Sequence, residues 1–351
     1  MKIIILLITV SLLLCSCATT DIGKLETNDI TTVENPFENI TSDNQNFSTD
    51  EGSDWLDEES EDYMELFGKY QVGGFFFGNW LPQESQIEYN GGKIEISFSS
   101  DSTGNEFDVE EGYVAFLNGI PQLISINGGE ETELVCRSQM PDTVDTVTLS
   151  VTPRITKDLI DETNLTLTIL SIFQPSFKPE GQYVGFGNAH RGNFHIALDL
   201  IVNSPLEVID ESEKAFTEYE SILITDTVKE EYDLGDNYHT NNKMIYIQEP
   251  STNRFVLPIK EGSDTIQANL LMFGPETGDY KVYLYKKHQH IQISGYDYIN
   301  MEVKTGCLSM VTLNLENIQD RDFLYAIAIS TDFKNVYGIY KSSSVLIVQE
   351  D

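Results

Sequence analysis

Residues 164–170 read Asn-Leu-Thr-Leu-Thr-Ile-Leu, in which polar and apolar side chains alternate as far as Ile169. Leu165, Leu167 and Ile169 fall on one side of an extended chain, because neighbouring residues of a strand point to opposite faces. Residues 93–99 and 146–151 alternate in the same way. These segments predict half-buried β-strands, and the fold class follows from them.

The rest of the chain after residue 66 extends this pattern. Residues 113–126 predict a hairpin around Asn118-Gly119, since a type I′ turn needs positive φ at both central residues. Further strands are expected at residues 194–202, 265–273, 280–293, 310–315, 323–330 and 345–348. Strands at spacings of roughly 8–12 residues, without helical crossovers, favour an all-β protein built from two antiparallel sandwiches.

The 285 residues after position 66 are long for one sandwich and natural for two. We expect a first sandwich domain at residues 67–205, ending where Asn203-Ser204-Pro205 breaks a strand, and a second at 221–351. Residues 206–220 between them are charged and predict a connector, with the composition of a short helix. Residues 276–280, Glu-Thr-Gly-Asp-Tyr, resemble the tyrosine corner of immunoglobulin-like sandwiches, which implies that architecture for the second domain.

The N-terminus carries a different signal. Lys2 precedes an apolar run that is too short to span a bilayer stably, and the run ends in Leu14-Cys15-Ser16-Cys17. This stretch resembles the lipobox of bacterial lipoproteins. The resemblance implies removal of residues 1–16, a diacylglyceryl group with fatty acids such as palmitate on Cys17, and display on the outer side of the membrane. The alternative is an uncleaved apolar anchor.

Residues 17–66 contrast sharply with the signal. Positions 21–66 hold fifteen Asp or Glu and one Lys, Lys24, with few large apolar residues. Such a segment cannot bury enough surface to fold alone. It predicts a disordered acidic tether that lifts the folded part away from the membrane, and the alternative is a peptide recognised by a basic partner.

The chain has a formal net charge of −36, which disfavours nucleic acid as a partner. Against this background, Lys286, Lys287 and His288 form an unusual cationic patch that could contact an anionic polymer or the neighbouring domain. His288 and His290 lie two residues apart in a predicted strand, so they would share a face. We interpret them as a solvated edge and expect no metal, although His190 or His195 could complete a ligand set.

Other candidate features are weaker. Trp80 could stack on a sugar ring, and the alternative is a core position in the opening strand. The oxygen-rich residues 101–108 and 233–237 could bind calcium, but neither has the order of an EF-hand, so no cofactor is predicted. Cys136 and Cys307 stand one in each domain and are expected to be buried free thiols, with a bridge between the domains as the alternative.

The sequence contains no hydrolase elbow, zinc-protease motif, P-loop or Rossmann glycine pattern, and therefore no catalytic residue is assigned. We expect a membrane-anchored lipoprotein of the cell envelope. Its two sandwiches would bind an envelope polymer, a glycan or a protein, or would serve a structural role. The alternative is an exported hydrolase or an accessory domain of one.

Overall fold

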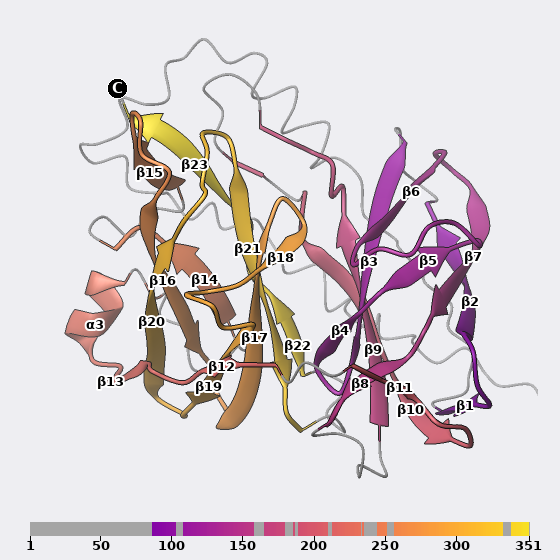
Figure 1. Ribbon diagram of the computed structural model, residues 1–351. Coiled ribbons are helices and arrows are strands. Elements are labelled where there is room, and N and C mark those ends of the chain that lie inside the picture. The colour runs from indigo at the N-terminus through magenta and orange to yellow at the C-terminus, as the bar shows by residue number, and fades with distance from the viewer. Residues whose placement is uncertain are drawn as a thin grey trace, which may run out of the picture. The chain divides into compact units, whose positions relative to one another are not determined.

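The computed structural model describes residues 86–102, 108–157, 165–179, 185–186, 189–209, 213–232, 234, 244–250, 256–332 and 338–350. These residues belong to one compact unit, residues 59–351. They form an all-β structure, which confirms the predicted fold class (Figure 1). In the described part of the chain, no helix has the length and apolarity needed to cross a membrane.

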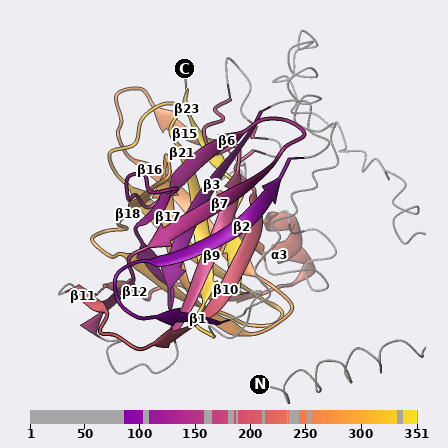
Figure 2. The ribbon, with the colours of Figure 1, turned by 90° about the vertical axis from the view of Figure 1, so that its right-hand side faces the viewer.

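Two facing sheets make the first sandwich. One has the order β1 (Gln86–Tyr89), β10 (Gly192–Val202), β9 (Leu165–Phe173), β3 (Val109–Leu117) and β4 (Ile120–Gln122), with β6 (Val135–Gln139) also paired to β3. The other has the order β2 (Ile94–Asp101), β7 (Val144–Val151) and β5 (Ile124–Ile126), and Figure 2 shows β2 and β7 side by side. A short parallel pair joins β8 (Arg154–Thr156) to β11 (Glu207–Ile209).

The second sandwich is also built from two sheets. The larger has the order β12 (Ala215–Phe216), β19 (Tyr298–Val303), β17 (Gly278–Lys286), β21 (Phe323–Ser330), β23 (Val345–Glu350) and β15 (Val256–Lys260), with β18 (Gln289–Ile291) on β17 and β22 (Ile339–Lys341) on β21. The smaller has the order β13 (Glu220–Leu223), β20 (Cys307–Leu315), β16 (Ile266–Phe273) and β14 (Met244–Gln248). A separate apolar cluster on the outer face of this smaller sheet packs beneath the helix α3 (Asp226–Glu231).

The alternating residues form the cores as predicted. Ile94, Ile96 and Phe98 of β2 are buried against inward-facing residues of β7 and β9. A separate core fills the second sandwich, with Tyr280 buried in it. The tyrosine-corner hydrogen bond of Tyr280 stays a prediction. Most neighbouring strands are antiparallel. The edge strands β1, β12 and β15 instead pair in parallel with their neighbours.

The hairpin at Asn118-Gly119 is confirmed, with φ of 45° and 76° at these residues. Its second strand is split, because the chain leaves the β3 sheet after β4 and joins the facing sheet as β5. Residues 206–220 have the composition of a short helix, but their described residues include β11, β12 and the start of β13 and form no helix. β11 pairs with β8, β12 pairs with β19 and β13 pairs with β20, so backbone pairing at sheet edges keeps this segment extended. The domain boundaries stay predictions.

Candidate functional site at the junction of the two sandwiches

A third apolar cluster lies where the two sandwiches meet, and we call it the junction. The first sandwich contributes Val114, Phe116, Leu170, Ile172 and Phe186, and the second contributes Tyr283, Tyr285, Phe323, Tyr325, Ile327, Ile329, Ile339 and Leu346. The rings of Phe116 and Tyr283 lie 5.9 Å apart across it. This cluster explains why every residue of β9 is buried, since one face of β9 fills the first sandwich and the other fills the junction.

The predicted strand at residues 280–293 is interrupted. β17 ends at Lys286, β18 begins at Gln289, and Lys287 and His288 form the two-residue turn between them with φ of 48° and 65°. This is the pattern of a type I′ hairpin. His288 therefore lies in a turn, and the prediction that His288 and His290 share one strand is wrong.

His288 reaches across the junction. Its Nε2 lies 2.5 Å from the carbonyl oxygen of Pro175 in the first sandwich, and its Nδ1 lies 3.1 Å from the Tyr325 hydroxyl. A carbonyl can only accept, so Nε2 carries the proton and Nδ1 accepts from Tyr325. Burial is the main cause that lowers the pKa of His288 to about 4, and Lys341 and Lys178 act in the same direction.

His290 makes different contacts. Its Nε2 lies 2.7 Å from the carbonyl oxygen of Asp297, within the second sandwich. Its backbone N–H donates to the Glu133 carboxylate of the first sandwich over 3.2 Å. Each histidine therefore has its own partners, and no group of three His, Cys, Asp or Glu able to hold a metal occurs among the described residues.

His190 and Lys341 complete the junction. The sequence pointed to His190 only as a possible metal ligand, and it did not single out Lys341. His190 is fully buried, its Nδ1 lies 3.0 Å from the Ser344 hydroxyl, and its ring lies 5.1 Å from that of His288. Burial, followed by the charges of Lys341 and the nearby His288, lowers the pKa of His190 to about 2. A Ser–His pair is the geometry of an activated nucleophile, but a histidine with this pKa is a poor base at neutral pH.

The Lys341 side chain is surrounded by neutral groups. Its Nζ donates to the carbonyl oxygens of His190 and Ser342, and it lies 4.1 Å from the centre of the Tyr325 ring. Burial lowers the pKa of Lys341 to about 7. The carbonyl and ring contacts stabilise the cation without a carboxylate.

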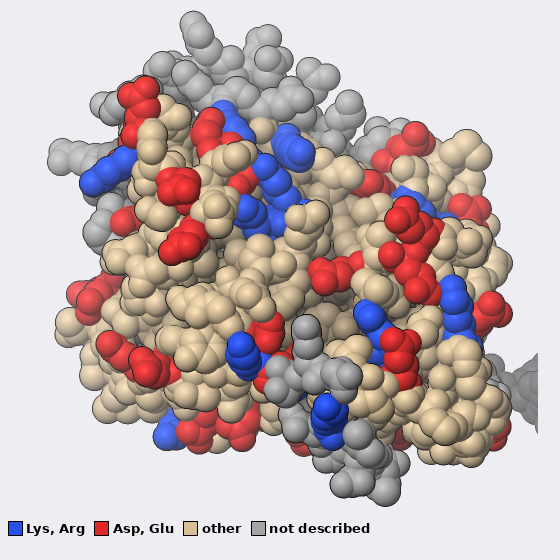
Figure 3. All heavy atoms as spheres, in the orientation of Figure 1, with Lys and Arg blue, Asp and Glu red and all other residues tan. Residues whose placement is uncertain are grey.

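The predicted cationic patch lies beside this junction. Lys287 forms an ion pair with the buried Asp322, and Lys286 lies 3.9 Å from the same carboxylate while donating to the Asn317 carbonyl over 2.6 Å. The Lys287 side chain is 43 % exposed. Figure 3 shows Lys and Arg side chains gathered in the upper part of this face. One carboxylate thus partly neutralises two lysines, and the binding role of the patch stays a prediction.

Glu213 fixes the segment that links the sandwiches. Its carboxylate accepts a hydrogen bond from Tyr283 over 3.0 Å and lies 3.3 Å from the Lys281 ammonium. Burial raises the pKa of Glu213, while Lys281 and Tyr283 oppose the rise. The connecting segment is therefore tied to a strand that also lines the junction.

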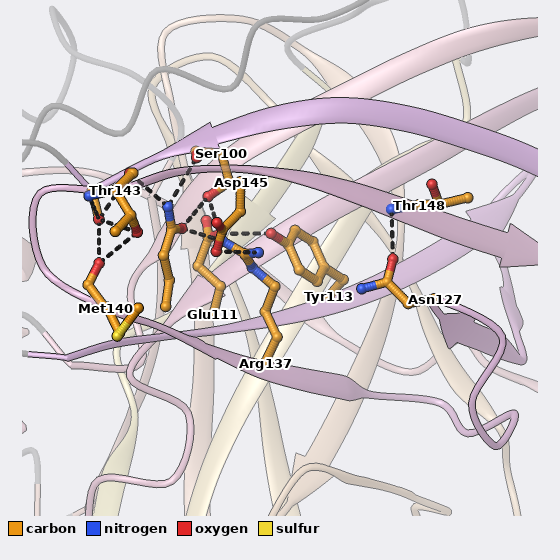
Figure 4. A network of polar contacts seen from close by, with 11 residues as sticks. Ser100, Glu111, Tyr113, Asn127, Arg137, Met140, Thr143, Asp145 and Thr148 are labelled. Atoms are coloured by element: carbon orange, nitrogen blue, oxygen red, sulfur yellow. Dashed lines mark hydrogen bonds and ion pairs between the residues drawn. The ribbon is translucent and has the colours of Figure 1, made fainter.

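A second polar network lies inside the first sandwich (Figure 4). Glu111 of β3 accepts hydrogen bonds from Tyr113 over 2.6 Å and from Ser100 of β2 over 3.0 Å. Arg137 of β6 lies 3.9 Å from Glu111 and 3.5 Å from Asp145 of β7. Burial, then the Glu111 charge, raises the pKa of Tyr113. Because Glu111 is only 1 % exposed, this network is suited to joining the facing sheets and not to contacting a substrate.

Several other predictions have definite outcomes or lie outside the described residues. Cys136 and Cys307 are free, but Cys136 is exposed and Cys307 is partly exposed, so the expectation of two buried thiols is wrong. Even-numbered residues of β6 point away from the core that holds Val135. Cys17 and Trp80 lie outside the described residues. So do residues 103–107, 233 and 235–237 of the two possible calcium loops.

Comparison with known proteins assigns no family. No protein-family model and no curated protein matches the chain. A solved CARDB domain of the PF1109 protein from Pyrococcus furiosus is 13 % identical, covers 30 % of this chain and 88 % of its own, and has a TM-score of 0.21. The CsuC-CsuE complex of Acinetobacter baumannii is 11 % identical, covers 78 % of this chain and 99 % of its own, and has a TM-score of 0.21. At these scores the likeness carries no functional argument.

Proposed function

We propose that this protein is an exported lipoprotein that binds an envelope polymer, a glycan or a protein partner and performs no catalysis. Lipid on Cys17 would hold it at the outer face of a bacterial membrane, with the acidic residues 17–66 as tether. The junction is the observation that carries the proposal. A shared apolar core and the cross-junction contacts of His288 and His290 join the two sandwiches.

A joined pair of sandwiches is well suited to binding. Surfaces that are already ordered lose little conformational entropy when a partner docks, so more of the contact energy appears as affinity. The ammonium groups of Lys286 and Lys287, beside the junction, would bind an anionic group on the partner. The buried His190–Ser344 pair favours binding over hydrolysis, because Ser344 is 7 % exposed and His190 is a weak base.

Fatty-acid labelling tests the anchor. Replacing Cys17 by Ala should abolish incorporation of labelled palmitate, because the thioether can form only on that thiol. Replacing Cys15 by Ala is the matched control and should leave labelling unchanged. Labelling that survives the loss of Cys17 would overturn the anchor assignment.

Cosedimentation with purified cell-wall sacculi, together with a panel of soluble neutral and acidic glycans, tests the binding function. The protein used is the mature chain with Cys17→Ala, which cannot be lipidated. The test variant is the double substitution Lys287→Gln with Asp322→Asn, which replaces the ion pair of the patch by two amides. Loss of one charge contact should weaken binding about tenfold. The matched control replaces the exposed pair Lys304–Glu302 by two Gln and should bind normally.

Two outcomes of that experiment would contradict the proposal. One is equal binding by the patch variant and the control, which would remove the patch from the binding surface. The other is cleavage of a panel glycan at enzymic rates by the mature chain, which would support the hydrolase alternative.

A further inference from the structure

Three basic groups from both sandwiches meet in the junction. His190 comes from the segment before β10 of the first sandwich, His288 from the β17–β18 turn and Lys341 from β22. The two imidazole rings lie 5.1 Å apart, and the Lys341 ammonium donates to the backbone carbonyl of His190. Both rings also pack on Phe323, at 4.7 Å and 4.9 Å between ring centres.

The charged and titratable groups around this contact offer little compensation. From the first sandwich these are Lys178, Glu133 and Cys136, and from the second they are Tyr285, Tyr325, Glu213, Lys287 and Asp322. The pKa values of both tyrosines lie well above 10, mainly through burial, so they stay neutral. Asp322 is engaged with Lys287, and Glu133 accepts from the His290 backbone. Among the described residues, no carboxylate forms an ion pair or a hydrogen bond with the side chain of His190, His288 or Lys341.

We propose that the contact of His190, His288 and Lys341 is an acid-sensitive latch, in which protonation of the two histidines beside the lysine separates the sandwiches. In the closed form one ring proton suffices for His288, since His288 donates from Nε2 and accepts at Nδ1, and the Nε2 atom of His190 is buried without a hydrogen-bond partner among the described residues. A second proton on His288 would break the bond from Tyr325, because Nδ1 could no longer accept. It would also place like charges close together at a site where His190 is fully buried and His288 and Lys341 are only partly exposed, so water screens these charges poorly.

The sign of the pH dependence follows from linkage. An exposed histidine has a pKa near 6.5, whereas the closed junction lowers the pKa of His288 to about 4 and that of His190 to about 2. Above pH 6.5 both rings are neutral in the closed and open forms, so the histidines do not favour opening there. As pH falls below 6.5 the open form binds more protons, and at two pH units below 6.5 each histidine shifts the equilibrium towards opening by about a hundredfold.

Small-angle X-ray scattering between pH 7.5 and pH 4 tests the latch, with the mature chain carrying Cys17→Ala. The maximum dimension should increase reversibly as pH falls below 6.5, while circular dichroism shows that both sandwiches keep their strand content. The double variant His190→Phe, His288→Gln should lower the midpoint by at least one pH unit, since Phe fits beside Phe186 and Phe323. The control His290→Gln keeps a donor for the Asp297 carbonyl and should open at the same pH as wild type.

A second set of measurements serves if the double variant does not fold. Lys341→Met removes the ammonium and should also lower the midpoint, while histidine NMR on the wild type should show two rings that stay neutral while the protein is closed and become protonated at the pH at which its dimension increases. The latch is refuted if both rings protonate near pH 6.5 without a change in dimension, or if these variants open at the wild-type pH. The result does not depend on what the protein binds.

Discussion

A buried charge depends on its partner far more than an exposed one does, and Arg137 provides a test. Replacing Arg137 by Met leaves the Glu111 carboxylate buried with no cationic neighbour, which should lower the free energy of unfolding by about 3–5 kcal/mol. Replacing Lys304, whose ion pair with Glu302 is exposed, should cost less than about 1 kcal/mol. Urea unfolding followed by fluorescence measures both changes. Similar losses in the two variants would show that the network does not join the sheets.

Single residues also show how far the sequence reveals the candidate site. Lys286 and Lys287 stood out because they are adjacent cations in an acidic chain. The sequence indicated His190 only as a possible metal ligand and did not single out Lys341, because an isolated histidine or lysine in a strand-rich sequence has no periodic pattern around it. They are 151 positions apart, and only the packing of one sandwich on the other brings them together.

At the level of strands, the alternation of polar and apolar residues predicted where strands occur better than it predicted which of their faces are buried. β2 and β7 were predicted correctly because each has one buried face. β9 was predicted as half-buried, yet both faces are covered, since Thr166, Thr168 and Ser171 are small enough to be buried beside its leucines. The composition of residues 206–220 allows a short helix, but pairing with available sheet edges overrode that local preference. The Lys287-His288 turn was missed because it lacks the Asn or Gly that usually marks one.

For the described molecule as a whole, the junction decides how the two sandwiches behave. Each sandwich has its own core, so each contains apolar contacts that could persist without the other. The junction cluster instead takes residues from both and buries Phe116, Tyr283 and Tyr325 almost completely. Exposing these rings on separation would be costly, since each large aromatic side chain contributes several kcal/mol of burial. The two sandwiches should therefore unfold together at neutral pH.

Calorimetry tests this coupling. The wild type should unfold in one cooperative transition at pH 7.5, and Phe116→Ala should split it into two, because the lost ring leaves a cavity between the sandwiches worth about 3–5 kcal/mol. Leu149→Ala is the matched control, since Leu149 is equally buried but lies in the core of the first sandwich alone. It should lower the transition temperature of the coupled unit without splitting the transition. Two transitions in the wild type at neutral pH would show that the junction core does not couple the sandwiches.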